Sequence, residues 1–278
     1  IKYEIKLTKE FLDKHMCDCD VLIHAAGLVS FQKADVELLK KINIEGTANV
    51  MNVALSHNFK KCIYISSVST LGRKDGDLEI NEESFFSANK SVSNYAYSKY
   101  YAEQEVWRAS SEGINTIILN PSIILGPGDW NKGSSKIFQT VFNGLKFYSP
   151  GSSGYVDVMD VAKITIQFLS EKIKNERYIL NGTNISFQDV FNQIADEFKI
   201  PRAKYKVTPF LKELAWRVDA LKTFFTGMPS LLTKETANSA MKSVAYSSKK
   251  IKETLKYDFI PIDKTIKEYC RFFEKELI

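Results

Sequence analysis

The sequence has no apolar run near the roughly 18 residues that cross a bilayer, and its opening segment lacks the apolar core of a signal peptide. Its four cysteines are too few and too unevenly spaced for a disulfide framework, which indicates a reducing compartment. No second ligand cluster accompanies His15, Cys17 and Cys19, so we expect no metal site. These absences predict a cytoplasmic protein with no membrane partner.

The sequence also lacks internal repeats and low-complexity tracts. Its net charge of +5 includes scattered lysine pairs at Lys40-Lys41, Lys60-Lys61 and Lys249-Lys250, without a basic segment interleaved with aromatics. Nucleic-acid binding is therefore not expected. A chain of 278 residues is long enough to bury a core as one large domain or two coupled lobes.

Three apolar segments read as buried parallel strands that end in small or hydroxylated residues. Residues 20–23 lead into His24-Ala25-Ala26-Gly27, residues 61–65 into Ser66-Ser67, and residues 115–119 into Asn120-Pro121-Ser122. Helical stretches lie between them, which is typical of a doubly wound α/β sheet. Such sheets bind ligands at the carboxyl ends of their strands, so we expect the site there.

Tyr95 and Lys99 stand four residues apart in a stretch without glycine or proline that reads as a helix. Positions i and i+4 share a helix face, so both side chains can enter one site. A nearby cation stabilises a phenolate and lowers the pKa of the phenol. A tyrosine in this setting can exchange a proton with a carbonyl or alcohol oxygen.

Six motifs in order give the chain a specific resemblance over about residues 18–185. They are His24–Gly27, Asn43-Ile44-Glu45-Gly46-Thr47, Ser66-Ser67, Tyr95 with Lys99, Asn120-Pro121-Ser122 with Gly126-Pro127-Gly128, and Tyr155–Ala162. The chain resembles the extended short-chain dehydrogenases/reductases, the superfamily of NAD(P)-dependent epimerases, dehydratases and reductases. The resemblance implies a Rossmann-type doubly wound parallel sheet with a smaller C-terminal substrate lobe.

The resemblance also implies roles for individual residues. Tyr95 would be the acid–base catalyst, Lys99 would bind the nicotinamide ribose and depress the tyrosine pKa, and Ser67 would hold the reacting oxygen. Ser66 is the alternative should the alignment be displaced by one residue, and Asn43 would be mainly structural. The residues expected to line the NAD or NADP site are His24, Ala25, Ala26, Gly27, Ser66, Lys99, Pro121 and Ser122.

The family's glycine-rich turn, G-x-x-G-x-x-G, does not occur in the sequence. In the family this turn meets the dinucleotide pyrophosphate at a helix N-terminus. Residues 1–6 resemble the family's third strand, so the first strand–helix unit is missing, and we expect residues upstream of the sequence rather than a natural truncation. NAD and NADP cannot be distinguished without that unit. Gly151 and Gly154 lie far downstream and indicate a turn.

The second half reads as a substrate-binding part combined with the end of the sheet. We expect a nucleotide-binding lobe at 1–125 and 155–182 and a substrate-binding lobe at 126–154 and 183–278. Asp160 and Ser186 are expected to cap helices. Residues 211–225 predict an amphipathic helix that packs on the core or, less expectedly, covers the substrate cleft.

The segment from Asn120 to Gly128 resembles the dihydroflavonol-reductase and hydroxysteroid-dehydrogenase-like branch. It implies hydride transfer between nicotinamide and a secondary alcohol or carbonyl on an apolar or aromatic small-molecule substrate. Two alternatives stay open: a nucleotide-sugar epimerase or dehydratase, and a non-catalytic binding member of the same fold. The resemblance also implies a possible homodimer through the helices that begin near Val36 and Tyr95.

Overall fold

The computed structural model describes residues 7–72, 79–86, 92–226 and 233–276. The chain divides into two compact units. Unit 1 comprises residues 1–75, 81–121 and 162–179, and unit 2 comprises residues 76–80, 122–161 and 180–278. The expected strand at residues 1–6 lies outside the described residues.

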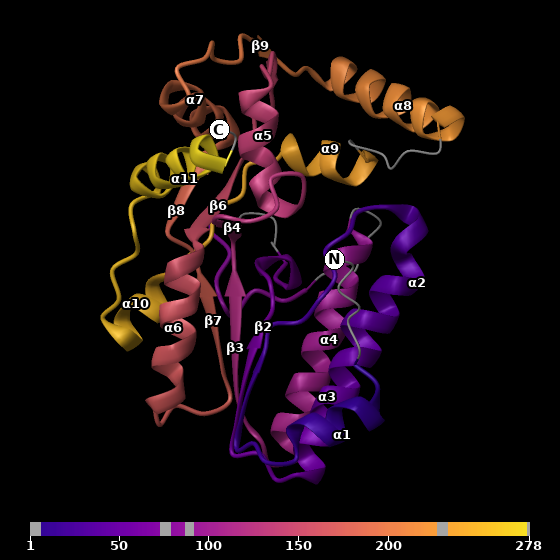
Figure 1. Cartoon of the computed structure of the whole chain (residues 1–278), viewed down its shortest axis with the longest axis vertical. Coiled ribbons are helices and arrows are strands. Elements are labelled where there is room, and N and C mark those ends of the chain that lie inside the picture. Colours follow the sequence, from indigo (N-terminus) through magenta and orange to yellow (C-terminus); the bar gives the residue numbers. More distant parts are fainter. Residues whose placement is uncertain (1–6, 73–78, 87–91, 227–232, 277–278) are drawn as a thin grey trace. The chain divides into compact units, whose positions relative to one another are not determined.

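Unit 1 is built on a four-stranded sheet in the order β1-β2-β3-β7 (Figure 1). The strands are β1 (Val21–His24), β2 (Lys61–Ile65), β3 (Asn115–Pro121) and β7 (Glu176–Leu180). The first three are parallel, with Val21 opposite Lys61 and Lys61 opposite Asn115. This confirms the parallel α/β sheet and the three expected strands. β1 is an edge of the described sheet.

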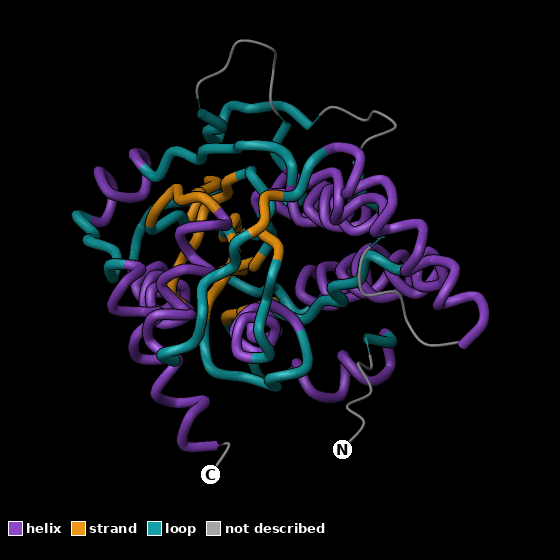
Figure 2. Tube along the Cα trace, turned by 90° about the horizontal axis from the view of Figure 1, so that it is seen from above, coloured by secondary structure: helices purple, strands orange, loops and turns teal. Residues whose placement is uncertain are grey.

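Helices cover both faces of this sheet, as Figures 1 and 2 show. The helical elements before β3 are α1 (Lys9–Met16), α2 (Val36–Leu39), the π-helical turn η2 (Lys40–Glu45), α3 (Gly46–Ser56) and α4 (Asn94–Ser111). Short 3₁₀ turns occupy η1 (Lys33–Asp35) and η3 (Val68–Thr70). Residues 162–170 of α6 (Val158–Ser170) belong to the same unit.

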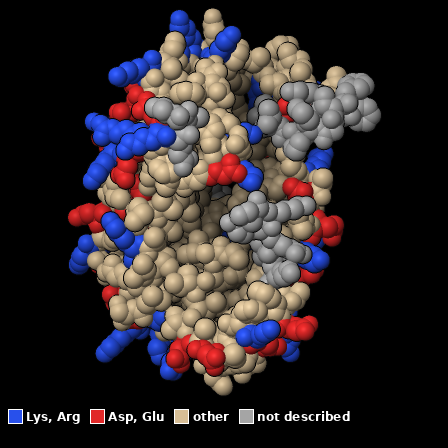
Figure 3. Space-filling view, in the orientation of Figure 1, with Lys and Arg blue, Asp and Glu red and all other residues tan. Residues whose placement is uncertain are grey.

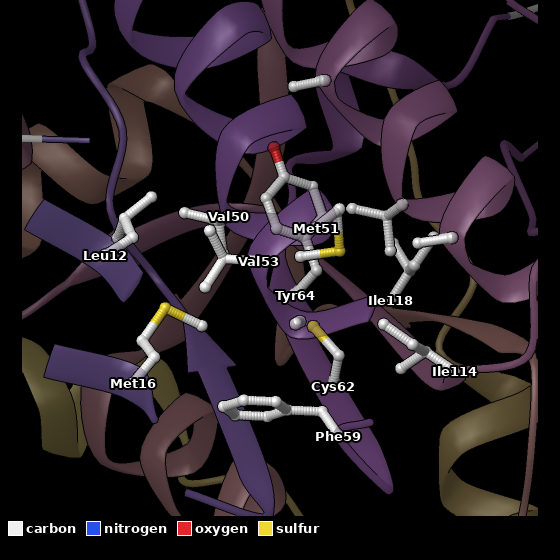
Figure 4. Packing of buried hydrophobic residues seen from close by; sticks show 14 residues of the cluster. Leu12, Met16, Val50, Met51, Val53, Phe59, Cys62, Tyr64, Ile114 and Ile118 are labelled. Carbon is white, nitrogen blue, oxygen red and sulfur yellow. The ribbon is translucent and has the colours of Figure 1, made fainter. Parts of the chain in front are cut away.

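The core of unit 1 lies between the sheet and α1, α3 and α4. Figure 4 shows Cys62 and Tyr64 of β2 directed toward Val50 and Met51 of α3, and all four side chains are buried. Neighbouring Ile63 is completely buried as well, so β2 is covered on both faces. The apolar run from Cys62 to Ile65 agrees with this double burial.

Unit 2 contains a three-stranded sheet in the order β4-β6-β8 and a short parallel pair, β5 with β9. The strands are β4 (Ile123–Leu125), β6 (Ser152–Asp157), β8 (Thr183–Ser186), β5 (Phe147–Tyr148) and β9 (Tyr205–Lys206). The helical elements are η4 (Gly133–Ser135), α5 (Lys136–Phe142), α7 (Phe187–Glu197), α8 (Pro209–Thr226), α9 (Lys234–Ala240), α10 (Lys249–Leu255) and α11 (Ile262–Glu276). Buried Leu125, Phe138, Tyr155 and Phe273 anchor its core.

Two local expectations in unit 2 are wrong. Asp160 does not cap a helix: α6 already begins at Val158, and Asp157 accepts the Met159 amide at 2.8 Å. Asp160 is fully buried and instead accepts hydrogen bonds from Tyr257 and from the Ile260 amide. Residues 152–154 belong to β6 rather than to a turn, because the backbone there passes close to other segments. A Cβ at Gly151 would stand 2.3 Å from the Lys242 carbonyl oxygen.

Other expectations hold. The Ser186 hydroxyl accepts the Asp189 amide at 3.0 Å and so caps α7. The helix expected at 211–225 is α8, but its apolar residues Leu214, Val218 and Leu221 are exposed rather than packed on the core as expected. The two compact units divide the chain differently from the expected lobes, since 122–125 and 155–161 fall in unit 2. The assignment of nucleotide and substrate binding to separate lobes stays a prediction.

Candidate active site

The parallel register of β1, β2 and β3 brings three expected segments to the same edge of the unit 1 sheet. His24 is opposite Tyr64, and Ile65 is opposite Leu119. The residues that follow each strand, from Ala25, Ser66 and Asn120 onward, therefore lie at the carboxyl edge where such sheets bind ligands. The structure thus confirms that the three segments that follow these strands lie at one edge of the sheet.

Helix α4 carries Tyr95 and Lys99 toward this edge. Its first turn is fixed by Ser93, whose hydroxyl accepts the Ala96 amide at 3.1 Å. Tyr95 is partly buried, and its ring lies edge-on to Phe31 with centroids 5.7 Å apart. Burial raises the pKa of Tyr95, and the neighbouring Ser67 side chain partly offsets that rise, so the net lowering of this pKa that was expected from Lys99 is not found.

Lys99 is deeply buried beside Tyr95 on α4. Its Nζ donates to the Tyr64 hydroxyl at 2.7 Å and to the Ile65 carbonyl at 2.9 Å. Burial of the amine lowers the pKa of Lys99 to about 7. The lysine is therefore aimed at the end of β2, and Tyr64, which sequence reasoning missed, is its side-chain partner. Alternation along β2 could not have singled out Tyr64, because the strand is buried on both faces.

His24 is a buried, neutral residue. Its Nε2 lies 2.9 Å from the Thr47 hydroxyl, and its ring centroid is 5.3 Å from that of Tyr64. Burial, together with the charge of Lys99, lowers the pKa of His24 to about 3. The His24 side chain thus holds α3 against the sheet, and any contact of this segment with a cofactor would come from the residues after it.

Those residues, Ala25, Ala26 and Gly27, have small side chains and are exposed or partly exposed. A Cβ at Gly27 would stand 3.4 Å from Asn43 Oδ1 and 3.9 Å from Lys99 Nζ. A ligand can therefore approach this backbone closely, next to the lysine amine. Asn43 itself is structural: its amide bonds both backbone groups of Leu28 and the Ser98 hydroxyl.

A buried carboxylate, Glu103, lies behind the strand ends and was missed by sequence reasoning. Its Oε2 accepts hydrogen bonds from Ser66, Thr70 and Asn120 at 2.6, 3.0 and 3.0 Å. Its Oε1 pairs with Arg177. Glu103 stands four residues after Lys99 and eight after Tyr95, so the same helix-face argument could have found it.

The Glu103 cluster fixes the loop that carries Ser67. Asn120 Nδ2 and the Thr70 hydroxyl both donate to the Ser67 carbonyl oxygen, each at 3.0 Å. The Ser66 hydroxyl is turned toward Glu103, so of the two serines only Ser67 presents its side chain to Tyr95. The chemical roles assigned to both serines stay predictions.

The last two expected residues lie at the end of β3. Pro121 is buried at the strand end in unit 1. Ser122 belongs to unit 2, where both its amide and its hydroxyl donate to the Leu180 carbonyl, at 3.0 and 3.3 Å. The structure therefore brings Ser67, Tyr95, Lys99 and Gly27 together in unit 1, whereas the Ser122 side chain is committed to its own backbone contact.

The fold and this site define a Rossmann-type enzyme of the short-chain dehydrogenase kind. The crystal structure of gox2253 matches with a TM-score of 0.81 and 28% identity, covering 98% of this chain and 83% of that chain. UDP-glucose 4-epimerase from Thermotoga maritima matches with a TM-score of 0.78 at 16% identity, covering 99% of this chain and 85% of that chain, and supports the fold alone.

Among curated relatives, a protein of Synechocystis sp. with the provisional name dihydroflavonol 4-reductase is 29% identical, over 87% of this chain and 73% of its own length. Cinnamoyl-CoA reductase 1 of Petunia hybrida is 26% identical, over 81% of this chain and 71% of its own. The family model described as "NAD dependent epimerase/dehydratase family" matches residues 3–180. The chain belongs to this family, which confirms the expected enzyme class and a nicotinamide dinucleotide as its cofactor class.

The residues present fit the ribose and nicotinamide side of such a cofactor. Small, open residues at 25–27 adjoin the buried Lys99 amine, and the Tyr95 phenol lies on the same helix face. For the pyrophosphate the sequence offers no glycine-rich turn. Within the described residues, no helix is long and apolar enough to cross a membrane.

Proposed function

We propose that the protein reduces a carbonyl group on an apolar or aromatic small molecule, with Tyr95 as the proton donor. The observation that carries this proposal is the buried Lys99 amine on the same face of α4 as Tyr95, with the Ser67 side chain beside the phenol. The dihydroflavonol-reductase and cinnamoyl-CoA-reductase relatives support a carbonyl substrate of this kind.

A nicotinamide cofactor would supply the hydride, and Lys99 with residues 25–27 would hold its ribose side. The Ser67 hydroxyl then donates a hydrogen bond to the substrate oxygen and orients it toward Tyr95. Tyr95 Oη transfers its proton to that oxygen as negative charge develops there. The protonated Lys99 amine stabilises the resulting phenolate, because a cation close to a phenolate favours the charged form.

Because burial raises the pKa of Tyr95, the phenol holds its proton at neutral pH, as a proton donor must. Alcohol oxidation would instead require a phenolate before reaction.

The test replaces Tyr95 by phenylalanine in the full-length protein. We expect kcat for NADH- or NADPH-dependent reduction of aromatic and apolar carbonyls to fall roughly 10²–10⁴-fold, since the acid is lost. Dinucleotide affinity, measured by fluorescence titration, should change little because the ring remains. Tyr97→Phe is the matched control: Tyr97 lies two positions further along α4, and its ring contacts Phe86 and Tyr101. Normal turnover in Tyr95→Phe would refute the proposal.

The same assays separate the remaining alternatives. A protein that retains dinucleotide through purification and binds UDP or TDP would be an epimerase or dehydratase. Dinucleotide binding without turnover on any carbonyl would indicate a non-catalytic member.

A cytoplasmic location and a homodimer are further parts of this proposal. All four cysteines are free, and Cys17 and Cys19 are exposed, which suits a reducing compartment. Sedimentation would establish the oligomeric state.

A further inference from the structure

Helix α8 presents an apolar stripe to solvent. Phe210, Leu214, Val218 and Leu221 are 78, 49, 57 and 58% exposed. They are spaced four, four and three residues apart, so they lie along one face of the helix. A surface helix of a globular protein normally turns its apolar face to the core, and this one does the reverse.

The opposite side of α8 faces its neighbouring helix, α9. Lys212 Nζ donates to Asn238 of α9 at 2.7 Å, and Lys234 of α9 lies 5.8 Å from the Trp216 ring centroid. Lys212 and Trp216 are four residues apart, about half a helix turn from the apolar stripe. The side of α8 that carries Lys212 and Trp216 therefore contacts α9, and the stripe lies on the other side, toward solvent.

The stripe adjoins the most basic part of the sequence. Residues 199–222 contain seven lysines and arginines but only two acidic residues, a net charge of +5, and the rest of the chain is electrically balanced. The net charge is thus concentrated, contrary to what the scattered lysine pairs suggested. Lys204, Lys206 and Arg217 are all exposed. Figure 3 shows basic side chains at the end of unit 2 where β9 lies in Figure 1.

We propose that α8 and the basic segment before it bind the surface of an anionic phospholipid bilayer. An apolar stripe beside basic side chains is the pattern of helices that lie in the plane of a membrane interface. Phe210, Leu214, Val218 and Leu221 enter the acyl boundary, and Lys204 and Lys206 meet the lipid phosphates, whereas Arg217 is already paired with Glu213 at 3.0 Å. The contact is peripheral and departs from the expectation of no membrane partner, which rested on the lack of a membrane-spanning segment. It goes beyond the proposed reductase activity without depending on it.

Charge and chemistry argue for this occupant over two others. Nucleic acid would satisfy the lysines but offers no apolar surface for leucine and valine side chains. A second copy of the chain carries the same positive charge, and four side chains of one helix fall well short of the ~800 Å² per partner of a standard interface. Anionic lipid satisfies both the stripe and the charge.

The experiment is co-sedimentation of the full-length protein with vesicles. We expect binding to phosphatidylcholine vesicles that contain phosphatidylglycerol, weaker binding in high salt, and little binding to pure phosphatidylcholine. Val218→Glu/Leu221→Glu should lower the partition coefficient by roughly tenfold or more, because charged groups replace apolar ones in the lipid. The matched control is Met159→Glu/Ile166→Glu on α6, two apolar residues that are 50 and 63% exposed.

A second pair of variants tests the charge. Lys204→Gln/Lys206→Gln should also lose roughly tenfold, whereas Lys264→Gln/Lys267→Gln on α11 should bind as the wild type does. Circular dichroism and thermal unfolding verify that each variant is folded. Unchanged vesicle binding in Val218→Glu/Leu221→Glu would overturn the proposal. So would a shift from dimer to monomer in that variant, which would identify the stripe as a subunit interface.

Discussion

Helices α4 and α8 each contain 18 residues. Both depart from the usual amphipathic pattern, but in opposite ways: α4 buries charged residues and α8 exposes apolar ones. α4 buries two charged residues, Lys99 at 5% and Glu103 at 0% exposure. α8 exposes four apolar residues and holds its charged Lys212 against α9. Burial of a charge and exposure of an apolar stripe both cost free energy, so each is a place to look for function.

The two helices differ in whether these unusual residues have interaction partners. The buried charges of α4 have partners inside the protein: Tyr64 and a carbonyl for Lys99, and Arg177 with three donors for Glu103. The described residues leave the stripe of α8 open to solvent. Buried charges that have partners within the protein indicate an internal site. An apolar stripe left exposed by the described residues indicates a binding partner outside the protein.

The largest stability effect should come from Glu103→Ala, which tests whether the α4 charges are truly compensated. Loss of the carboxylate leaves Arg177 and the Ser66 hydroxyl without their partner, whereas Thr70 and Asn120 keep the Ser67 carbonyl as an acceptor, and we expect about 3–5 kcal/mol lower unfolding free energy. Urea unfolding measures it. Glu105→Ala on the same helix removes a 2.9 Å surface ion pair with Arg108 and should cost less than about 1 kcal/mol. Equal losses of unfolding free energy in the two variants would show that the buried Glu103 contributes no more to stability than the surface Glu105.

An intermediate effect is expected from the pH dependence of Lys99. Burial lowers its pKa to about 7 in the folded protein, against about 10.4 in an unfolded chain. Between these values the unfolded state binds more protons, so the contribution of Lys99 to stability rises with pH across that window. In cofactor-free protein, the unfolding free energy of wild type minus that of Lys99→Met should therefore increase from pH 7 to about pH 10.

The control for Lys99→Met is Lys60→Met, at an exposed lysine paired with Asp20. That variant is expected to follow the wild type across the same pH range. Parallel unfolding curves for wild type and Lys99→Met would mean that the amine is not desolvated as the structure shows.

The smallest effect is expected on α8. Leu214→Ala should change the unfolding free energy by no more than about 0.5 kcal/mol, because the side chain is 49% exposed. The same substitution at Leu125, which is fully buried in unit 2, should cost about 2–5 kcal/mol. Chemical denaturation of both variants compares them directly. A large loss at Leu214 would place the stripe in the core and remove the contrast between the two helices.

Much of unit 1 could be predicted from the sequence because its signals are local. A short apolar, β-branched run such as residues 62–65 indicates a buried strand, and parallel strands of that kind end at one edge of the sheet when helices separate them. The spacing of Tyr95 and Lys99 places both on one helix face whatever surrounds them. The order of motifs was enough to indicate the family before any coordinates.

Side-chain partners could not be predicted, because they come from distant parts of the chain. Ser66 and Ser67 are neighbours of the same type, yet the Ser66 hydroxyl bonds Glu103 whereas the Ser67 side chain lies beside Tyr95, since adjacent strand-end residues point to opposite sides. Asp160 has the sequence signature of a helix cap but bonds Tyr257, almost a hundred residues away. The local preference of aspartate for a helix-cap position is overridden here by the long-range contacts of the buried side chain.

The sequence by itself determined the parallel sheet, the helix face shared by Tyr95 and Lys99, and the family, because these depend on periodicity and motif order along the chain. Only the tertiary structure decided that Lys99 turns to Tyr64, that Glu103 supports the Ser67 loop, and that α8 faces outward. The physical reason is that periodicity fixes which residues share a face, whereas long-range packing decides what that face meets.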